Sequence, residues 1–268
     1  MISMGSDQLD LFDAPPEPPP PVRAPTDAAI PAGLTDEALI AALAEATLAD
    51  VRELAAEAER RRLAAAVSAL AALCRRFTGF GATRPIVEQV VALRALGAIG
   101  GHEAARAVRR AITERQVQGP NLAAAMRAAT ALCLRLPREV ILMALRAEDR
   151  DLREAACGCA GADPDVVAAL LEVLDDLDGE VSRAAACALG RLGRMEALAP
   201  LIRELGRRPT AELIESVVPV ADETAVVLLG RLARTRPEFR QAAVTALEDC
   251  TAPMAARVLR GLPPDPGG

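Results

Sequence analysis

The middle of the chain repeats itself with a period of 29 residues. The stretch DRDLREAACGCAG, from Asp149, aligns with DGEVSRAAACALG, from Asp178. Acidic, alanine and glycine positions coincide in the two copies. A further copy, EFRQAAVTAL, begins at Glu238, and the end of the unit, ALGRLG, has an upstream counterpart in ALGAIG at Ala95. A short period of this kind predicts a stack of similar small units rather than one irregular core.

Each unit is predicted to be a pair of helices. In the clearest copy the first helix covers about 180–189, and Gly190 and Gly193 are expected to end it. The second helix, MEALAPLIREL, carries an apolar stripe at helical spacing, made of Leu198, Leu201, Ile202 and Leu205. Gly206 is expected to stop this helix. Similar pairs fit residues 84–117, 120–148, 210–234 and 238–262.

Start signals support these helix boundaries. Asp163 followed by Pro164 supplies a helix cap and a first-turn proline. Thr35, followed by two acidic residues, marks the start of an earlier segment with two or three helices. We predict an N-terminal helical cap over 34–82 and a repeat array over 83–262, because the open end of a stack must be covered.

Composition agrees with an all-α protein. Hydrophobic residues make up 51% of the 268 residues but aromatic residues only 1%, and much of the apolar content is alanine, the best helix former. No run of eighteen uncharged apolar residues occurs, so no membrane span is expected. The first residues lack a basic stretch followed by an apolar region, so we expect a cytoplasmic protein.

Residue types that carry catalysis or bind metals are sparse. Six cysteines lie scattered through apolar segments and are predicted to be reduced, buried thiols. His102 follows the predicted turn GAIGG at Gly97 and is expected to be a surface or turn residue. An acidic cluster is expected to solvate an inter-repeat turn and favour the next helix; it consists of Asp175, Asp176, Asp178 and Glu180. We therefore predict no catalytic residue, no metal and no cofactor.

The pattern A-A-x-x-A-L-G-x-L-G, found at 184–193, resembles HEAT-like repeats of the kind first named for phycobilisome lyases. The resemblance covers roughly residues 84–262 and is strongest between 149 and 205. It implies an α-solenoid in which helix pairs stack into a continuous core. Such repeats occur in scaffolds, lyases, chaperones and DNA-repair proteins, so the function has to be argued from particular sites.

A cluster of arginines is one candidate site. Arg106, Arg109 and Arg110 lie on one side of a predicted second helix, and second helices usually line the concave face of such solenoids. Residues 34–150 carry 17 Arg and 13 acidic residues, a net charge of +4, so this part could contact phosphates. Cations in a last helical turn also simply complement the helix dipole. The chain has no Trp or Tyr to stack on bases, so at most a weak DNA contact is expected.

The second candidate site is the pentapeptide QLDLF, Gln8 to Phe12. It resembles the peptide Gln-Leu-(Ser/Asp)-Leu-Phe by which many bacterial proteins bind the replicative DNA sliding clamp, and all five positions agree. Such a string is expected by chance about once per million positions. The resemblance implies that Leu11 and Phe12 are the apolar anchors and that Gln8 forms hydrogen bonds. Leu9 would add contact, and Asp10 would face solvent.

The surroundings of the pentapeptide suit a short binding motif. It lies in a predicted disordered tail, 1–12, that a proline-rich linker, 13–33, joins to the helices. The linker could span about 60 Å if fully extended. The last residues, 263–268, are predicted to be a second disordered tail. The alternative is that the apolar residues of the pentapeptide form an incidental patch that packs on the cap or has no role.

Three functions remain open from the sequence. The first is a non-enzymatic adaptor, in replication or repair, that binds the sliding clamp through Gln8–Phe12 and another protein through its repeats. The second is a general protein-interaction scaffold or lyase-type chaperone that does not bind the clamp. The third, a HEAT-like DNA glycosylase, would need a catalytic acid in a basic groove and aromatic residues around an extruded base.

Overall fold

The computed structural model describes residues 33–263, and in this part of the chain every regular element is helical. The Gln8–Phe12 peptide, the linker up to residue 32 and the end of the chain from residue 264 lie outside the described residues. The α-helices are α1 (Asp36–Ala44), α2 (Val51–Arg60), α3 (Val67–Arg76), α4 (Val87–Ile99), α5 (Gly101–Thr113), α6 (Pro120–Ala131), α7 (Arg138–Leu145), α8 (Arg150–Cys159), α9 (Pro164–Val173), α10 (Gly179–Arg191), α11 (Leu198–Arg207), α12 (Ala211–Val217), α13 (Glu223–Thr235), α14 (Arg240–Asp249) and α15 (Pro253–Arg260). The prediction of an all-α solenoid is confirmed.

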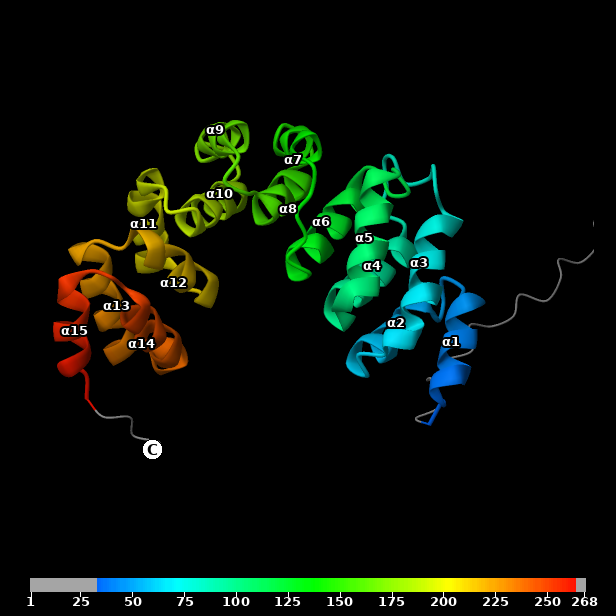
Figure 1. Ribbon diagram of the computed structural model, residues 1–268, viewed down its shortest axis with the longest axis horizontal. Helices are drawn as coiled ribbons and strands as arrows, with labels where there is room; N and C mark the ends of the chain where they lie inside the picture. Colours follow the sequence, from blue (N-terminus) through cyan, green and yellow to red (C-terminus); the bar gives the residue numbers. More distant parts are fainter. Residues whose placement is uncertain (1–32, 264–268) are drawn as a thin grey trace, which may run out of the picture.

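Consecutive helices alternate between two layers, which curve together into an arch (Figure 1). The even-numbered helices pack on one another from α2 to α14 and lie on the inner side of the arch, whereas α7, α9, α11 and α15 lie on its outer side. The expectation that second helices line the concave face is therefore wrong. In this molecule the first helix of each pair does so.

Small residues explain which layer is on the inside. A Cβ atom added to Gly97 of α4 would lie 3.2 Å from the Cα of Ala128 in α6. One added to Gly158 of α8 would lie 2.7 Å from Oγ1 of Thr130, also in α6. First helices therefore approach one another closely. The layer with the shorter helix spacing becomes the inner side of a curved stack.

Two glycines do not end helices as the sequence suggested. Gly190 lies inside α10, which runs on to Arg191, and a Cβ atom there would lie 2.3 Å from the carbonyl oxygen of Ser216 in α12. The chain turns instead at Gly193, which has φ +69°. Gly206 likewise lies inside α11. A glycine near the end of a helical pattern commonly signals a stop, whereas at position 190 it permits close packing.

The predicted start signals are confirmed. Asp163 accepts hydrogen bonds from the backbone N–H groups of Asp165 and Val166, and Thr35 accepts one from Ala38. The turn between α4 and α5 occurs at Gly100 and Gly101, both with positive φ, as the GAIGG stretch suggested. The predicted pairs over 84–117, 120–148, 210–234 and 238–262 each contain two α-helices.

Leucine and alanine fill a core that is continuous along the array. The largest fully buried side chains are almost all leucines, and α2 packs on α4 as α3 packs on α5, so residues 36–76 extend the same two layers. No helix within residues 33–263 has both the length and the apolar character needed to cross a membrane.

Candidate functional site

The α5 arginines lie on the surface of the N-terminal half of the array. Nη2 of Arg106 lies 3.2 Å from Oε1 of Glu103 and 3.2 Å from Nδ1 of His102, and Nε of Arg110 lies 3.5 Å from Oε1 of Glu114. These pairs are exposed and therefore weak, so they leave the cations available to a ligand. Arg109 has no ion pair within residues 33–263.

Only two of these three arginines line the same hollow on the surface. Arg106 and Arg110 line a hollow of about 260 Å³ between α3 and α5, together with Arg75 of α3, whereas Arg109 does not line it. We call this hollow the α3–α5 groove. Its other walls are mostly small and apolar and include Ala64, Ala65, Ala71 and Ala107, while Glu103 is its one acidic residue.

The sequence did not reveal the part of the groove that belongs to α3. Ser68, Ala71 and Arg75 follow one another at helical spacing and all line the groove. Small side chains on this face of α3 leave the space open, and Arg75 adds a positive charge to its lining. Arg75 has no ion pair among the described residues. The groove therefore combines positive charge with small apolar walls.

His102 lies at the start of α5 and is an exposed surface residue, as predicted. Its Nδ1 lies 3.8 Å from Oε1 of Glu103. With 81% of the side chain exposed, it lacks the enclosed surroundings in which a histidine is tuned as a general base.

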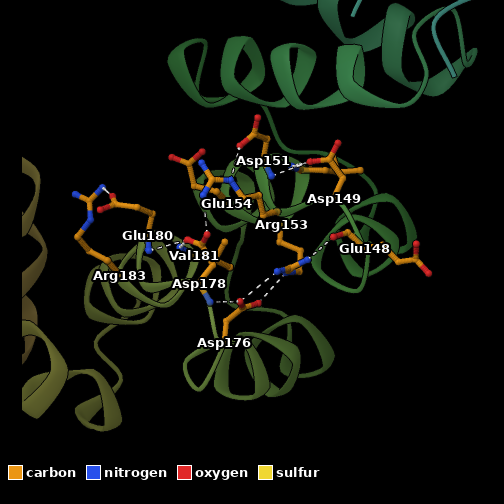
Figure 2. Close-up of polar contacts among 12 residues, drawn as sticks. Glu148, Asp149, Asp151, Arg153, Glu154, Asp176, Asp178, Glu180, Val181 and Arg183 are labelled. Carbon is orange, nitrogen blue, oxygen red and sulfur yellow. Dashed lines mark hydrogen bonds and ion pairs between the residues drawn. The ribbon is translucent and has the colours of Figure 1, made fainter. Parts of the chain in front are cut away.

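The acidic cluster at the α9–α10 turn joins neighbouring repeats (Figure 2). Arg153 of α8 donates from Nε and Nη2 to both carboxylate oxygens of Asp176, at 2.7 and 3.1 Å. Its Nη1 donates to the carbonyl oxygens of Ala147 and Glu148, at 2.9 and 2.8 Å. The side chains of Arg153 and Asp176 are only 19% and 12% exposed. Asp176 therefore does not merely solvate the turn, as the sequence suggested, because it ties two inter-repeat turns together.

Asp178 caps the start of the next helix, α10, as predicted for the acidic cluster. Its Oδ1 accepts hydrogen bonds from the backbone N–H groups of Glu180 and Val181 at the start of α10, and these bonds lower its pKa. Its Oδ2 also lies 2.8 Å from Nη1 of Arg150. The hydrogen bond from Arg153 likewise lowers the pKa of Asp176. Both carboxylates are thus held in the charged form by contacts that form only in the folded chain.

We expect the substitution Asp176→Asn to lower the free energy of unfolding at pH 7 by about 1–3 kcal/mol, because Arg153 keeps its burial but loses its counterion. A lowered pKa in the folded state stabilises the protein above the unfolded pKa of about 4, and this contribution is lost as pH falls through the folded value. The difference from wild type in urea unfolding should therefore stay constant from pH 7 to about pH 5 and shrink as the pH falls below about 4.

The matched control for this prediction is Asp175→Asn, which removes the same charge from the adjacent, exposed position. It should change the free energy of unfolding by less than about 0.5 kcal/mol. Equal losses for the two variants, or a loss at Asp176 that does not depend on pH, would show that the ion pair with Arg153 is not the cause.

The inner side of the arch carries ion pairs that link successive first helices. Arg127 of α6 contacts Glu154 of α8 at 2.6 Å, and Arg191 of α10 contacts Glu212 of α12 at 3.2 Å. A hollow of about 210 Å³ lies between these two pairs. Sequence reasoning missed these contacts, because each pair joins residues of different repeats that are more than twenty positions apart.

An apolar groove lies between α5 and α7, where the outer helices pack less closely than α3 and α5 do. We call this hollow of about 600 Å³ the α5–α7 groove. Its lining is mainly apolar and includes Ile112, Val117, Leu122, Val140, Met143 and Leu152. Met143 is 51% exposed. Exposed apolar surface of this kind is typical of protein contact sites.

The cysteines are packing residues in most cases. Burial raises the pKa of Cys74 and of Cys157 to about 12, so both are thiols at neutral pH. Cys133 is exposed, with φ +51°, which corrects the prediction that all six are buried, and Cys250 is half-buried. Within residues 33–263, no group of three or more His, Cys, Asp or Glu residues is placed to hold a metal ion.

Comparison with known families identifies HEAT repeats over residues 138–218. This stretch runs from the start of α7 to the end of α12 and contains the clearest copies of the 29-residue repeat. Residues 138–218 are therefore HEAT-like repeats, and repeats of this kind are typical of protein-interaction scaffolds. No curated protein matches the chain.

Proposed function

We propose that this HEAT-like repeat protein is a non-enzymatic adaptor of the bacterial cytoplasm that binds the DNA sliding clamp through Gln8–Phe12. The observation that carries the proposal is the agreement of QLDLF with the clamp-binding pentapeptide at all five positions. The motif precedes the helical body by a proline-rich stretch. A short peptide motif needs such a separation, because it must enter a groove on another protein.

The affinity expected from these residues is modest. Burial of Leu11 and Phe12 contributes about 1.5–3 kcal/mol each, polar contacts from Gln8 add to this, and ordering a peptide subtracts several kcal/mol. A dissociation constant near 1 μM, about −8 kcal/mol, is the expected balance. The clamp would thus recruit the protein reversibly.

The repeat body supplies the second half of the adaptor. Its HEAT repeats support a protein partner, and so does the α5–α7 groove, in whose apolar lining Met143 is exposed. The repeat match alone also fits the second candidate, a general scaffold or lyase-type chaperone without clamp binding. The two candidates differ in whether residues before the helical body are needed.

Calorimetry with purified sliding clamp tests the proposal. The full chain should bind with a micromolar dissociation constant, and a chain that lacks residues 1–14 should not bind. A peptide of residues 1–14 alone should retain binding, since the motif carries the contact. If the full chain shows no heat at tens of micromolar clamp, the adaptor role fails and the scaffold without clamp binding is favoured.

Direct DNA binding by the α5 arginines is expected to be weak and to depend strongly on salt. If Arg106, Arg109 and Arg110 make two or three phosphate contacts, the affinity for duplex DNA should fall about 10- to 50-fold between 50 and 200 mM salt. Changing all three to alanine should weaken binding in a mobility-shift assay, whereas Arg257→Ala/Arg260→Ala on α15 should not. Tight, salt-resistant or damage-selective binding would instead support the glycosylase class.

A further inference from the structure

The α3–α5 groove has features that select one kind of occupant. Three guanidinium groups, those of Arg75, Arg106 and Arg110, surround a floor of small apolar side chains, against a single carboxylate from Glu103. Its volume of about 260 Å³ exceeds the roughly 150 Å³ that accommodates a benzene ring in a protein cavity. The groove therefore suits an aromatic side chain flanked by carboxylates.

The chain itself contains such a segment. Asp10 lies two positions before Phe12, with Leu11 between these two residues, and Asp13 directly follows Phe12. Residues 1–33 carry one Arg and five acidic residues, a net charge of −4, opposite in sign to the net +4 of residues 34–150. The charges of the segment and of the groove are thus complementary.

The first described helix lies one helix away from the groove, on the other side of α3 (Figure 1). Helix α1 packs against α3 and against the 3₁₀ turn η1 (Ala64–Ala66), and both of these contribute walls of the groove. Twenty-one peptide links separate Phe12 from Gly33. A proline-rich stretch of that length can reach up to about 60 Å when extended, so the tether lets Phe12 meet the groove as an intramolecular contact.

We propose that the N-terminal segment binds back to the α3–α5 groove, with Phe12 in the hollow and with Asp10 and Asp13 facing Arg75 and Arg110. The groove is then an intramolecular docking site that holds the same side chain proposed to enter the clamp. The two contacts exclude each other. The apparent association constant of any external partner of Phe12 is then the intrinsic constant multiplied by the fraction of chains in which the segment is free.

The test uses fluorine NMR of the full chain labelled with 4-fluorophenylalanine, because the protein has only four Phe residues. The variant Phe12→Leu identifies the Phe12 resonance. At 20 mM salt this resonance should be shifted and broadened relative to that of a labelled peptide of residues 1–32. In 1 M salt it should move to the peptide position, since screening removes the charge contacts. Identical spectra of chain and peptide at 20 mM salt would overturn the proposal.

Charge reversals on α3 and α5 locate the contact. Arg75→Glu/Arg110→Glu should return the Phe12 resonance to the free position, and Ala107→Leu, which fills the groove without changing charge, should do the same. The matched single-charge comparison is Arg110→Glu with Arg109→Glu. Arg110→Glu should shift the Phe12 resonance toward the free position, whereas Arg109→Glu, one residue away but outside the groove, should leave the docked signal in place. Thermal melting of each variant separates loss of docking from loss of folding.

The remaining outcomes are equally decisive. If Arg109→Glu releases Phe12 as much as Arg110→Glu does, the segment responds only to the overall electrostatic potential of the protein. The groove would then not be the site. If Arg75→Glu/Arg110→Glu leaves the Phe12 signal unchanged but abolishes binding of duplex DNA, the groove is a phosphate site and the proposal is wrong.

The clamp supplies a separate measurement. If it binds the segment, Arg75→Glu/Arg110→Glu should raise the affinity of the full chain for the clamp by about 2- to 10-fold, toward that of the isolated peptide. The fluorine experiment does not involve the clamp. Intramolecular docking can therefore fail while clamp binding holds, and the reverse can also be observed.

Discussion

Replacing both Leu11 and Phe12 by alanine is expected to abolish binding of the full chain to the sliding clamp. These two side chains supply most of the apolar area that the pentapeptide can bury, so their loss removes roughly 3–6 kcal/mol. That corresponds to a more than hundredfold increase in a micromolar dissociation constant, beyond the range of a normal titration. Isothermal titration calorimetry with purified clamp measures the effect directly.

Single substitutions give graded controls for this result. Gln8→Ala should weaken binding by about 0.5–3 kcal/mol, the contribution of one or two hydrogen bonds. In the isolated peptide of residues 1–14, Asp10→Ser should be nearly neutral, because that side chain would face water. The melting temperature should stay unchanged, since Leu11 and Phe12 precede the helical body. Equal binding by wild type and the double alanine variant would show that the match to the clamp motif is a coincidence.

The helix pairs could be predicted because each is encoded locally. The apolar stripe of MEALAPLIREL and the cap at Asp163 are both visible within a window of a dozen residues. A repeated pattern also makes each copy a check on the others. The match to HEAT repeats over 138–218 coincides with the region where the copies are most alike.

The errors arose where the contact partner lies in another repeat. Gly190 was expected to end a helix, yet a glycine is needed there because the backbone of Ser216, 26 residues further on, comes close to it. Asp176 was expected to face solvent, but Arg153 reaches it from the preceding first helix. A stop signal and a close-packing glycine look alike in sequence. So do a solvating aspartate and one that holds a neighbouring arginine.

The candidate surfaces were only partly predictable for the same reason. Arg106 and Arg110 could be assigned to one side of a helix from their spacing, but the role of Arg75 in the groove depends on how α3 packs beside α5. The inner or outer position of a helix depends on which layer packs more closely. That is decided by contacts such as Gly97 with Ala128 and Gly158 with Thr130, which no single repeat displays.

The substitution Gly190→Ala is expected to destabilise the array, although alanine is the better helix former. The new Cβ atom would lie 2.3 Å from the carbonyl oxygen of Ser216 and 2.7 Å from Cδ1 of Leu201. The leucine can rotate, but the carbonyl belongs to the backbone of α12, so α10 and α12 must separate. Overpacking of this kind costs about 1–3 kcal/mol and sometimes more, against a gain of about 1 kcal/mol in helix propensity.

The matched control is Gly206→Ala, which also lies within a helix and has no atom within 4 Å of the added Cβ. It should raise the free energy of unfolding by about 0.5–1 kcal/mol, so the two glycines should respond with opposite signs. Because each repeat in a solenoid is stabilised by its neighbours, weakening the α10–α12 contact should also separate the unfolding of α12–α15 from the rest. Urea unfolding of Gly190→Ala should then broaden or show two transitions, whereas Gly206→Ala keeps one. A stabilising effect of both substitutions would contradict the close approach of α10 and α12, and close packing would then not be what places the first helices on the inner side of the arch.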